Sequence, residues 1–160
     1  MTLPAEHLAE NQKLTADASV DLFQIIMRSG SRVYLKSNND VTWQGHLFEG
    51  IGIQVGGVGD STDQEANRPE LQISNPKGLF STLVRDGELD RATLIRYRVL
   101  RANLEADLNI YASRTWTIWK PKSLIHRVAV FELRTPSDGY NFITPARMFM
   151  PPEFPMVSLR

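Results

Sequence analysis

The residues best suited to catalysis lie in one acidic, glycine-rich segment, residues 50–67. Asp60, Asp63 and Glu65 cluster there, and paired carboxylates can act as general acid and base or bind calcium. The segment lacks the EF-hand pattern, and it lacks the GxGxxG and GK[ST] motifs that bind phosphate. We therefore expect a solvated loop, and the alternative is a small hydrolase that pairs Asp60 with Asp63 or Glu65.

Other catalytic groups are scattered or missing. The chain has no cysteine, which excludes disulfides, thiolate nucleophiles, cysteine zinc sites and cysteine-ligated iron–sulfur clusters. His7, His46 and His126 are never three or four positions apart, so no two of them share a helix face as metal ligands do. The GxSxG elbow of serine hydrolases is also absent. We therefore predict no catalytic, cofactor-binding or metal-binding residues.

Basic side chains gather in the segment 93–101, TLIRYRVLR. Interleaved arginine and tyrosine could form the stacking surface of a single-strand nucleic-acid binder. Strand alternation, however, places Tyr97 on the face opposite Arg96 and Arg98, so the ring and the charges do not share a groove. A polar strand face, or ion pairs with a neighbouring subunit, is the favoured interpretation, and the acidic segment is a candidate partner.

Aromatic side chains add further interface candidates. In a regular strand Trp116 and Trp119 point to opposite faces, so one suits the core and the other a subunit contact. Phe154 lies in the proline-rich end MPPEFPMVSLR, which is expected to be an extended arm lying on a neighbour. The candidate subunit-interface residues are Arg96, Arg98, Arg101, Asp60, Asp63, Glu65, Trp119 and Phe154.

A set of short strands must position these side chains. Apolar alternation and β-forming residues predict strands over 20–27, 32–36, 41–43, 46–48, 70–74, 93–101, 115–120 and 128–133. Turn residues at 29–31 and at 44–45 predict two hairpins. In the strand over 93–101, Thr93, Ile95, Tyr97 and Val99 share one face. The predicted fold is a mainly-β barrel or sandwich with one or two short helices.

The two helices are expected at 4–13 and after residue 75. Asn75 is a suitable N-cap, Pro76 suits the first helical position, and Gly87 can end the helix. Apolar residues at 79, 80, 83 and 84 follow helical spacing.

The composition fits one globular domain. The 160 residues are 42% hydrophobic, enough for a core, and the formal net charge of zero gives no general attraction to nucleic acid or anionic lipid. The longest apolar run, residues 22–27, is too short to span a bilayer, and the polar N-terminus lacks a signal-peptide core. We expect a soluble protein.

The order of several motifs resembles the N-terminal domain of the minor tail protein L family of long-tailed, lambda-like phages. The motifs are ASVDLFQI (18–25), VTWQG (41–45), RPELQISNPKG (68–78), the W-x-I of 116–118, FELRTPSDG (131–139) and PARMF (145–149). Together they span most of the chain. The motif and core residues are Trp43, Gly45, Arg68, Pro69, Leu71, Asn75, Trp116, Phe131, Arg147 and Phe149.

The resemblance implies a structural protein of the virion, not an enzyme. It implies a tail-tube-like β-barrel at the tail tip, a hub between a sixfold distal tail ring and a threefold central fibre protein, assembled in the host cytoplasm. A homotrimer is the favoured oligomer, and part of a pseudo-sixfold ring completed by the fibre protein is the alternative. No membrane or specific nucleic-acid partner is expected. A distal-tail or connector ring protein is the structural alternative, because such proteins have related barrels.

The resemblance also sets the expected domains and one departure. These are an N-terminal helical arm (1–17), a β-barrel hub domain (18–149) and a proline-rich C-terminal arm (150–160). Family members commonly continue into a C-terminal domain whose cysteines hold an iron–sulfur cluster. This chain has no cysteine, so we expect no cofactor.

Overall fold

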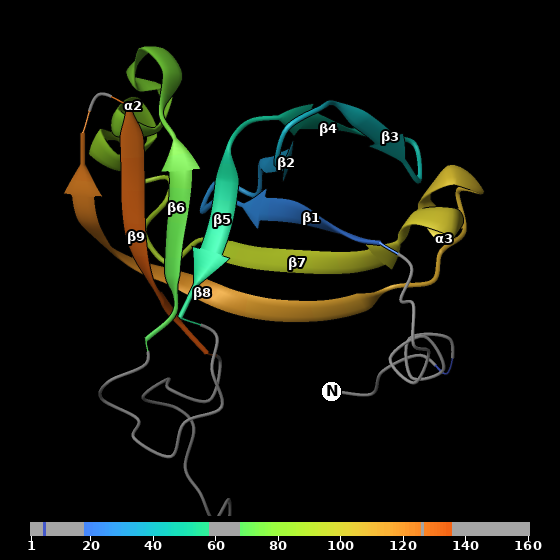
Figure 1. Ribbon diagram of the computed structural model, residues 1–160. Coiled ribbons are helices and arrows are strands. Elements are labelled where there is room, and N and C mark those ends of the chain that lie inside the picture. The colour runs from blue at the N-terminus through green and yellow to red at the C-terminus, as the bar shows by residue number, and fades with distance from the viewer. Residues whose placement is uncertain (1–4, 6–17, 58–67, 126, 136–160) are drawn as a thin grey trace, which may run out of the picture.

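The computed structural model describes residues 5, 18–57, 68–125 and 127–135, and nine strands in them form one sheet (Figure 1). The strands are β1 (Ser19–Ile26), β2 (Arg32–Lys36), β3 (Val41–Trp43), β4 (His46–Gly50), β5 (Ile53–Gly56), β6 (Glu70–Ser74), β7 (Thr93–Leu100), β8 (Ala112–Leu124) and β9 (Val128–Arg134). A short 3-10 helix, η1 (Pro76–Gly78), leads into α2 (Leu79–Arg85), and α3 (Arg101–Glu105) follows β7. The predicted mainly-β class with short helices is confirmed.

Both predicted hairpins are present. β1 and β2 pair antiparallel, with Gly30 at φ 87° between them. β3 and β4 pair antiparallel across a two-residue turn, in which Gln44 (φ 50°) and Gly45 (φ 74°) both have positive φ. Two central residues of positive φ match the right-handed twist of the flanking strands, which is why glycine suits this turn.

The long strand β8 bends the sheet. Its first half pairs with β7 and its second half with β9, with register shifts at Ile118/Lys120 and Pro121/Ser123. β9, β6 and β5 therefore cross over β1 and β7 instead of extending the sheet sideways (Figure 1). The strand order β3-β4-β2-β1-β7-β8-β9-β6-β5 leaves β3 and β5 as edges of the described sheet, so the sheet curls without closing into a barrel.

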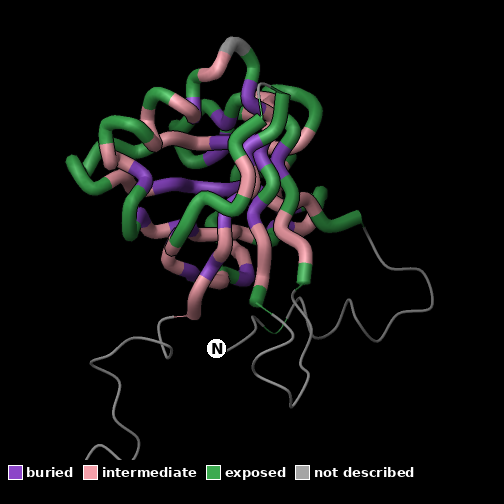
Figure 2. The backbone as a smooth tube through the Cα atoms, turned by 90° about the vertical axis from the view of Figure 1, so that its left-hand side faces the viewer, coloured by how far each residue is buried: buried purple, intermediate pink, exposed green. Residues whose placement is uncertain are grey.

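The centre of the sheet is buried on both faces. Residues 22–25 of β1 are all buried. Buried segments, purple in Figure 2, lie in the middle of the molecule, with exposed segments around them. One core, which includes Trp116, Phe131 and Phe80, lies between the two crossing halves of the sheet and under α2. A second core of Leu22, Trp43, Phe48 and Val99 lies on the other face. A strand covered on both sides is apolar on both faces, which explains Leu22, Phe23 and Ile25 of β1, while the buried Gln24 is bound by the Tyr97 hydroxyl.

The predicted alternation along β7 is present, but both of its faces contain buried residues. Val99 is buried in the second core as the alternation predicts. Leu94, however, lies on the face of Arg96 and is fully buried in the first core. β7 passes between two cores, so each of its faces is apolar over only part of its length.

Two elements were not predicted. Residues 50–67 were expected to be a loop, but Ile53–Gly56 forms β5, which pairs with β6 and buries Ile53. Burial against a neighbouring strand overrides the glycine-rich composition. The strand expected to reach Arg101 ends at Leu100, and Arg101 begins α3. β8 is also longer than the 115–120 expected.

The helix after Asn75 differs in detail. Gly78 has φ 74°, which separates η1 from α2. α2 therefore starts at Leu79, whose side chain is 55% exposed and does not join the predicted apolar stripe. Phe80 is buried, Leu83 and Val84 pack against the core, and the helix ends before Gly87 as expected. The helix expected at 4–13 lies outside the described residues, except for the helical Ala5.

Candidate functional site

The candidate carboxylates Asp60, Asp63 and Glu65 lie outside the described residues. Within the described ranges, three or more His, Asp or Glu side chains nowhere form a group that could hold a metal ion. His46, the one histidine described, stacks on the Tyr34 ring at 4.4 Å between centroids. No helix in the described part of the chain is long and apolar enough to cross a membrane.

Two of the candidate interface arginines have partners within the chain. Arg98 on β7 faces Asp21 on β1 and donates two hydrogen bonds to its carboxylate, at 2.9 and 3.2 Å. This hydrogen bonding raises the pKa of Arg98 against the opposing effect of burial. Arg101 forms an exposed ion pair with Glu105 on the next turn of α3, at 3.3 Å. Arg98 and Arg101 thus each have an ion-pair partner within the chain.

Arg96 is placed differently. Its guanidinium lies 5.3 Å from the Trp116 ring centroid, and that of Arg114, its direct cross-strand neighbour on β8, lies 5.5 Å from the same ring. Burial lowers the pKa of Arg96, and Arg98 and Arg114 act in the same direction while Asp21 opposes them. Like charges directly opposite each other on a sheet are destabilising. Arg96 is thus half-buried beside a second cation.

A cleft of about 380 Å³ opens beside Arg96, between β5 and the ends of β1 and β2. Asp21, Lys36 and Gln54 line it with Arg96. The Ser37 hydroxyl donates a hydrogen bond to the Ile53 carbonyl across this gap. The cleft therefore lies beside the edge strand β5.

Trp119 shows a related arrangement on the opposite face of β8 from Trp116. The guanidinium of Arg134 lies 3.8 Å and that of Arg91 5.8 Å from the Trp119 ring centroid. Trp116 is fully buried, whereas Trp119 is partly exposed beside a small apolar pocket of about 230 Å³. Trp116 is thus the core residue of the two, and the subunit contact expected of Trp119 stays a prediction.

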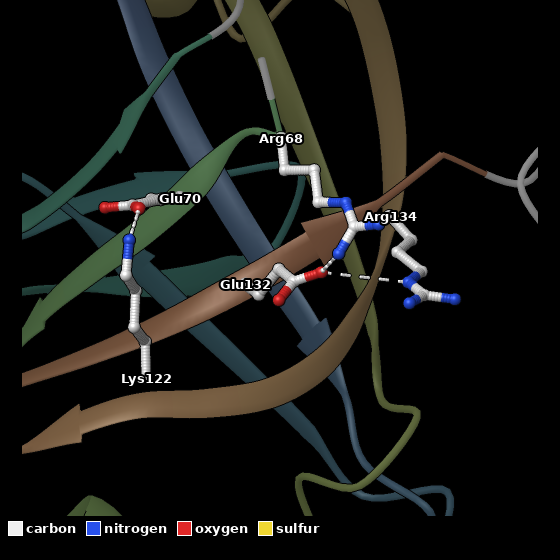
Figure 3. Close-up of polar contacts among 5 residues, drawn as sticks. All are labelled: Arg68, Glu70, Lys122, Glu132 and Arg134. Carbon is white, nitrogen blue, oxygen red and sulfur yellow. Dashed lines mark hydrogen bonds and ion pairs between the residues drawn. The ribbon is translucent and has the colours of Figure 1, made fainter. Parts of the chain in front are cut away.

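The RPEL motif joins β6 to β9. Arg68 forms an ion pair with Glu132 at 2.7 Å, and Arg134 lies 3.9 Å from the same carboxylate (Figure 3). The Pro69 carbonyl accepts a hydrogen bond from the Leu133 N–H at 2.8 Å. Leu71 pairs with Phe131, and both side chains are buried. A further pair, Glu70 with Lys122, lies beside them (Figure 3).

Asn75 links three elements from a fully buried position. Its Oδ1 accepts a hydrogen bond from the Phe80 N–H at 3.0 Å, so it caps α2 from beyond η1. Its Nδ2 donates to the Ser81 hydroxyl at 2.9 Å and to the Ile125 carbonyl at 3.3 Å. The predicted capping role is correct in kind, but the side chain also holds α2 to the end of β8.

The VTWQG motif docks on the loop after α3. The Trp43 Nε1–H donates to the Leu108 carbonyl at 3.2 Å. The Gln44 N–H donates to the Asp107 carboxylate at 2.8 Å, and its Nε2 donates to the Asp107 carbonyl at 2.7 Å. The motif residues Arg147 and Phe149, and the interface candidate Phe154, lie outside the described residues.

An aromatic cleft was missed by the sequence interpretation. It has a volume of about 220 Å³ and is lined by Tyr34, Trp43, His46, Phe48, Tyr97 and Tyr111, with Gln24, Arg32, Gln44 and Asn109 at its polar positions. The only sequence signal was the position of Tyr97 opposite the arginines, because the other rings come from separate strands and loops.

Comparison with known proteins identifies a family, a curated relative and solved structures of similar fold. Residues 30–154 match the family described as phage minor tail protein L. The chain is 29% identical over 168 aligned positions to the tail tip protein L of Escherichia phage lambda, covering 91% of this chain and 70% of that protein. A chain from the virion of a native gene transfer agent particle has a similar fold, with a TM-score of 0.57 at 13% identity, over 92% of this chain and 50% of that chain.

Proposed function

Because the chain belongs to the phage minor tail protein L family, we propose that it is a structural component of a phage tail tip that links the distal tail ring to the central fibre protein. The observation that carries this proposal is the match to the lambda tail tip protein L over 91% of the chain. The protein assembles in the host cytoplasm and remains in the virion.

The open sheet suits assembly into a ring. Its two edge strands, β3 and β5, carry backbone groups that need pairing or cover. Identical subunits placed side by side around an axis cover such edges through a repeated head-to-tail contact. We propose a homotrimer, which would match the symmetry of a threefold central fibre.

Arg96 is the centre of the proposed subunit contact. It is half-buried next to Arg114, so carboxylates from a neighbour would offset a like-charge repulsion. The acidic residues Asp60, Asp63 and Glu65 are the proposed source. Arg98 and Arg101 follow Arg96 in the chain. Because each already has an ion-pair partner within the chain, we expect them to contribute less to the subunit contact.

Cofactor chemistry is not part of the proposal. Iron–sulfur clusters are held by cysteine thiolates, and this chain has none. The residues present therefore do not fit the cluster of longer family members.

The test is complementation of a phage that lacks this gene. Wild-type chain restores complete tails and infectivity, whereas Arg96→Glu gives folded protein, incomplete tips and a large loss of plaques. Arg85→Glu on the exposed end of α2 makes the same charge change away from the contact and is the matched control. Normal tails with Arg96→Glu would overturn the proposed contact. Normal tails without the chain would overturn the structural function.

Arg98 needs a control of its own, because Arg98→Glu also breaks the pair with Asp21. The double variant Asp21→Arg with Arg98→Glu restores an internal pair with inverted polarity. Comparing the single and double variants separates loss of folding from loss of assembly.

A further inference from the structure

The aromatic cleft has the chemistry of a groove that binds extended proline-rich segments. Tyr97 and Tyr111 meet edge to face at 5.0 Å between centroids, and Trp43 contacts both rings at 5.8 and 5.5 Å. Tyr34 extends this surface, with its ring stacked on His46. Domains that recognise polyproline II segments use such rows of tyrosine and tryptophan, because the rigid segment loses little entropy on binding.

The rings are held in place before anything binds. The Tyr97 hydroxyl donates a hydrogen bond of 2.6 Å to Gln24 Oε1, and Gln24 is a buried polar side chain on β1. Trp43 is 4% exposed, and its Nε1–H is bound to the Leu108 carbonyl. The cleft volume of about 220 Å³ accommodates one or two small side chains rather than a drug-sized ligand. Preorganised rings of this kind favour a short peptide contact.

The chain itself carries a matching segment. Residues 150–155 read MPPEFP, in which Pro152 and Pro155 form a PxxP spacing around Glu153 and Phe154. Arg32 lies exposed at the cleft, and among the described residues it forms no ion pair. A guanidinium beside the rings is complementary to the single carboxylate of the segment.

We propose that residues 150–155 of this chain dock in the aromatic cleft, with the proline rings on Tyr97 and Tyr111 and Glu153 paired with Arg32. The segment is long enough to reach the cleft. Described chain ends at Thr135, and residues 136–149 span up to roughly 50 Å when extended, which exceeds the size of a small domain. The segment can therefore come from the same copy or from a neighbour in an assembly.

Disulfide trapping in the full chain tests this proposal, because the native sequence has no cysteine to interfere. Asn109→Cys places a thiol at the exposed rim of the cleft, and Met156→Cys places one directly after the segment. The control pair is Met156→Cys with Asp86→Cys, because Asp86 is an exposed site beyond α2. In a glutathione redox buffer, the effective concentration of the two thiols in the Asn109/Met156 pair should be about tenfold above that in the control pair. Non-reducing gels then show a cross-linked monomer for docking within a copy, or a dimer for docking between copies.

Substitutions added to the Asn109/Met156 cysteine pair test whether the prolines and the Arg32–Glu153 pair cause the docking. In the Asn109/Met156 cysteine pair, adding Pro152→Ala and Pro155→Ala should lower the effective concentration to the control level. Arg32→Glu should lower it as well, and Arg32→Glu with Glu153→Arg should restore it. Trapping that is no higher than the Asp86 control, or that is unchanged when both prolines are removed, would overturn the proposal.

Discussion

Asn75→Ala is the substitution that best tests how the two halves of the fold are joined. The side chain is fully buried and makes three hydrogen bonds, to Phe80, Ser81 and Ile125. Alanine removes all three at once. It leaves the Phe80 N–H, at the start of α2, without an acceptor inside the protein.

The magnitude follows from what each group loses. An unpaired buried N–H costs about 1–3 kcal/mol, and each of the other lost hydrogen bonds costs about 1 kcal/mol. The Ile125 carbonyl keeps the hydrogen bond from the Val128 N–H, so its loss is small. We expect Asn75→Ala to lower the free energy of unfolding by about 3 kcal/mol, which corresponds to a melting temperature lower by about 6–12 °C for a domain of this size.

Urea denaturation followed by tryptophan fluorescence measures this change. The midpoint should fall while the slope stays unchanged, because the surface exposed on unfolding is the same. Ser81→Ala removes only one of the three hydrogen bonds and should cost about 1 kcal/mol or less. A cost below about 1 kcal/mol for Asn75→Ala would refute the linking role of this residue.

The same denaturation assay checks three further variants. Trp116→Phe removes a buried Nε1–H that has no partner among the described residues. It should therefore lower the free energy of unfolding by only about 1–2 kcal/mol, less than replacement of tryptophan by alanine does. A loss above about 4 kcal/mol would contradict this. Gly45→Ala should cost about 1 kcal/mol through its positive φ alone, because the space around it is open; no loss would show that the turn relaxes. Burial, with Tyr111 and Tyr34 nearby, raises the pKa of the Tyr97 phenol above its ordinary 10.0. Its contribution to stability is therefore complete below pH 10.0 and is lost as pH rises above 10.0 through the folded-state value. Tyr97→Phe should flatten this alkaline loss above pH 10.0; an unchanged slope would contradict it.

The alternation of apolar residues was sufficient to predict the bounds of strands that bury one face. β2 and β6 have the predicted bounds, because Val33 with Leu35, and Leu71 with Ile73, alternate toward one core. The turn at Gln44-Gly45 was predictable for the same reason, since its backbone requirement is local.

The features that could not be predicted from the sequence depend on pairing between strands that are far apart in the chain. β5 exists because Ile53 pairs with Ile73 and is buried, although its neighbours are glycines. The partner of Arg98 depends on the register that brings β1 beside β7, far apart in sequence. The rings of the aromatic cleft come from β2, β3, β4, β7 and the segment before β8, so no continuous sequence motif predicts it.

The most direct test of the tail-tip assignment is an electron cryomicroscopy map of purified virions of the phage that encodes this chain. The assignment predicts density for the curled nine-stranded sheet at the distal end of the tail, between the last tail ring and the central fibre, with Arg96 facing an adjacent subunit. Absence of the chain from the mature particle, or its position at the junction of head and tail, would contradict the assignment.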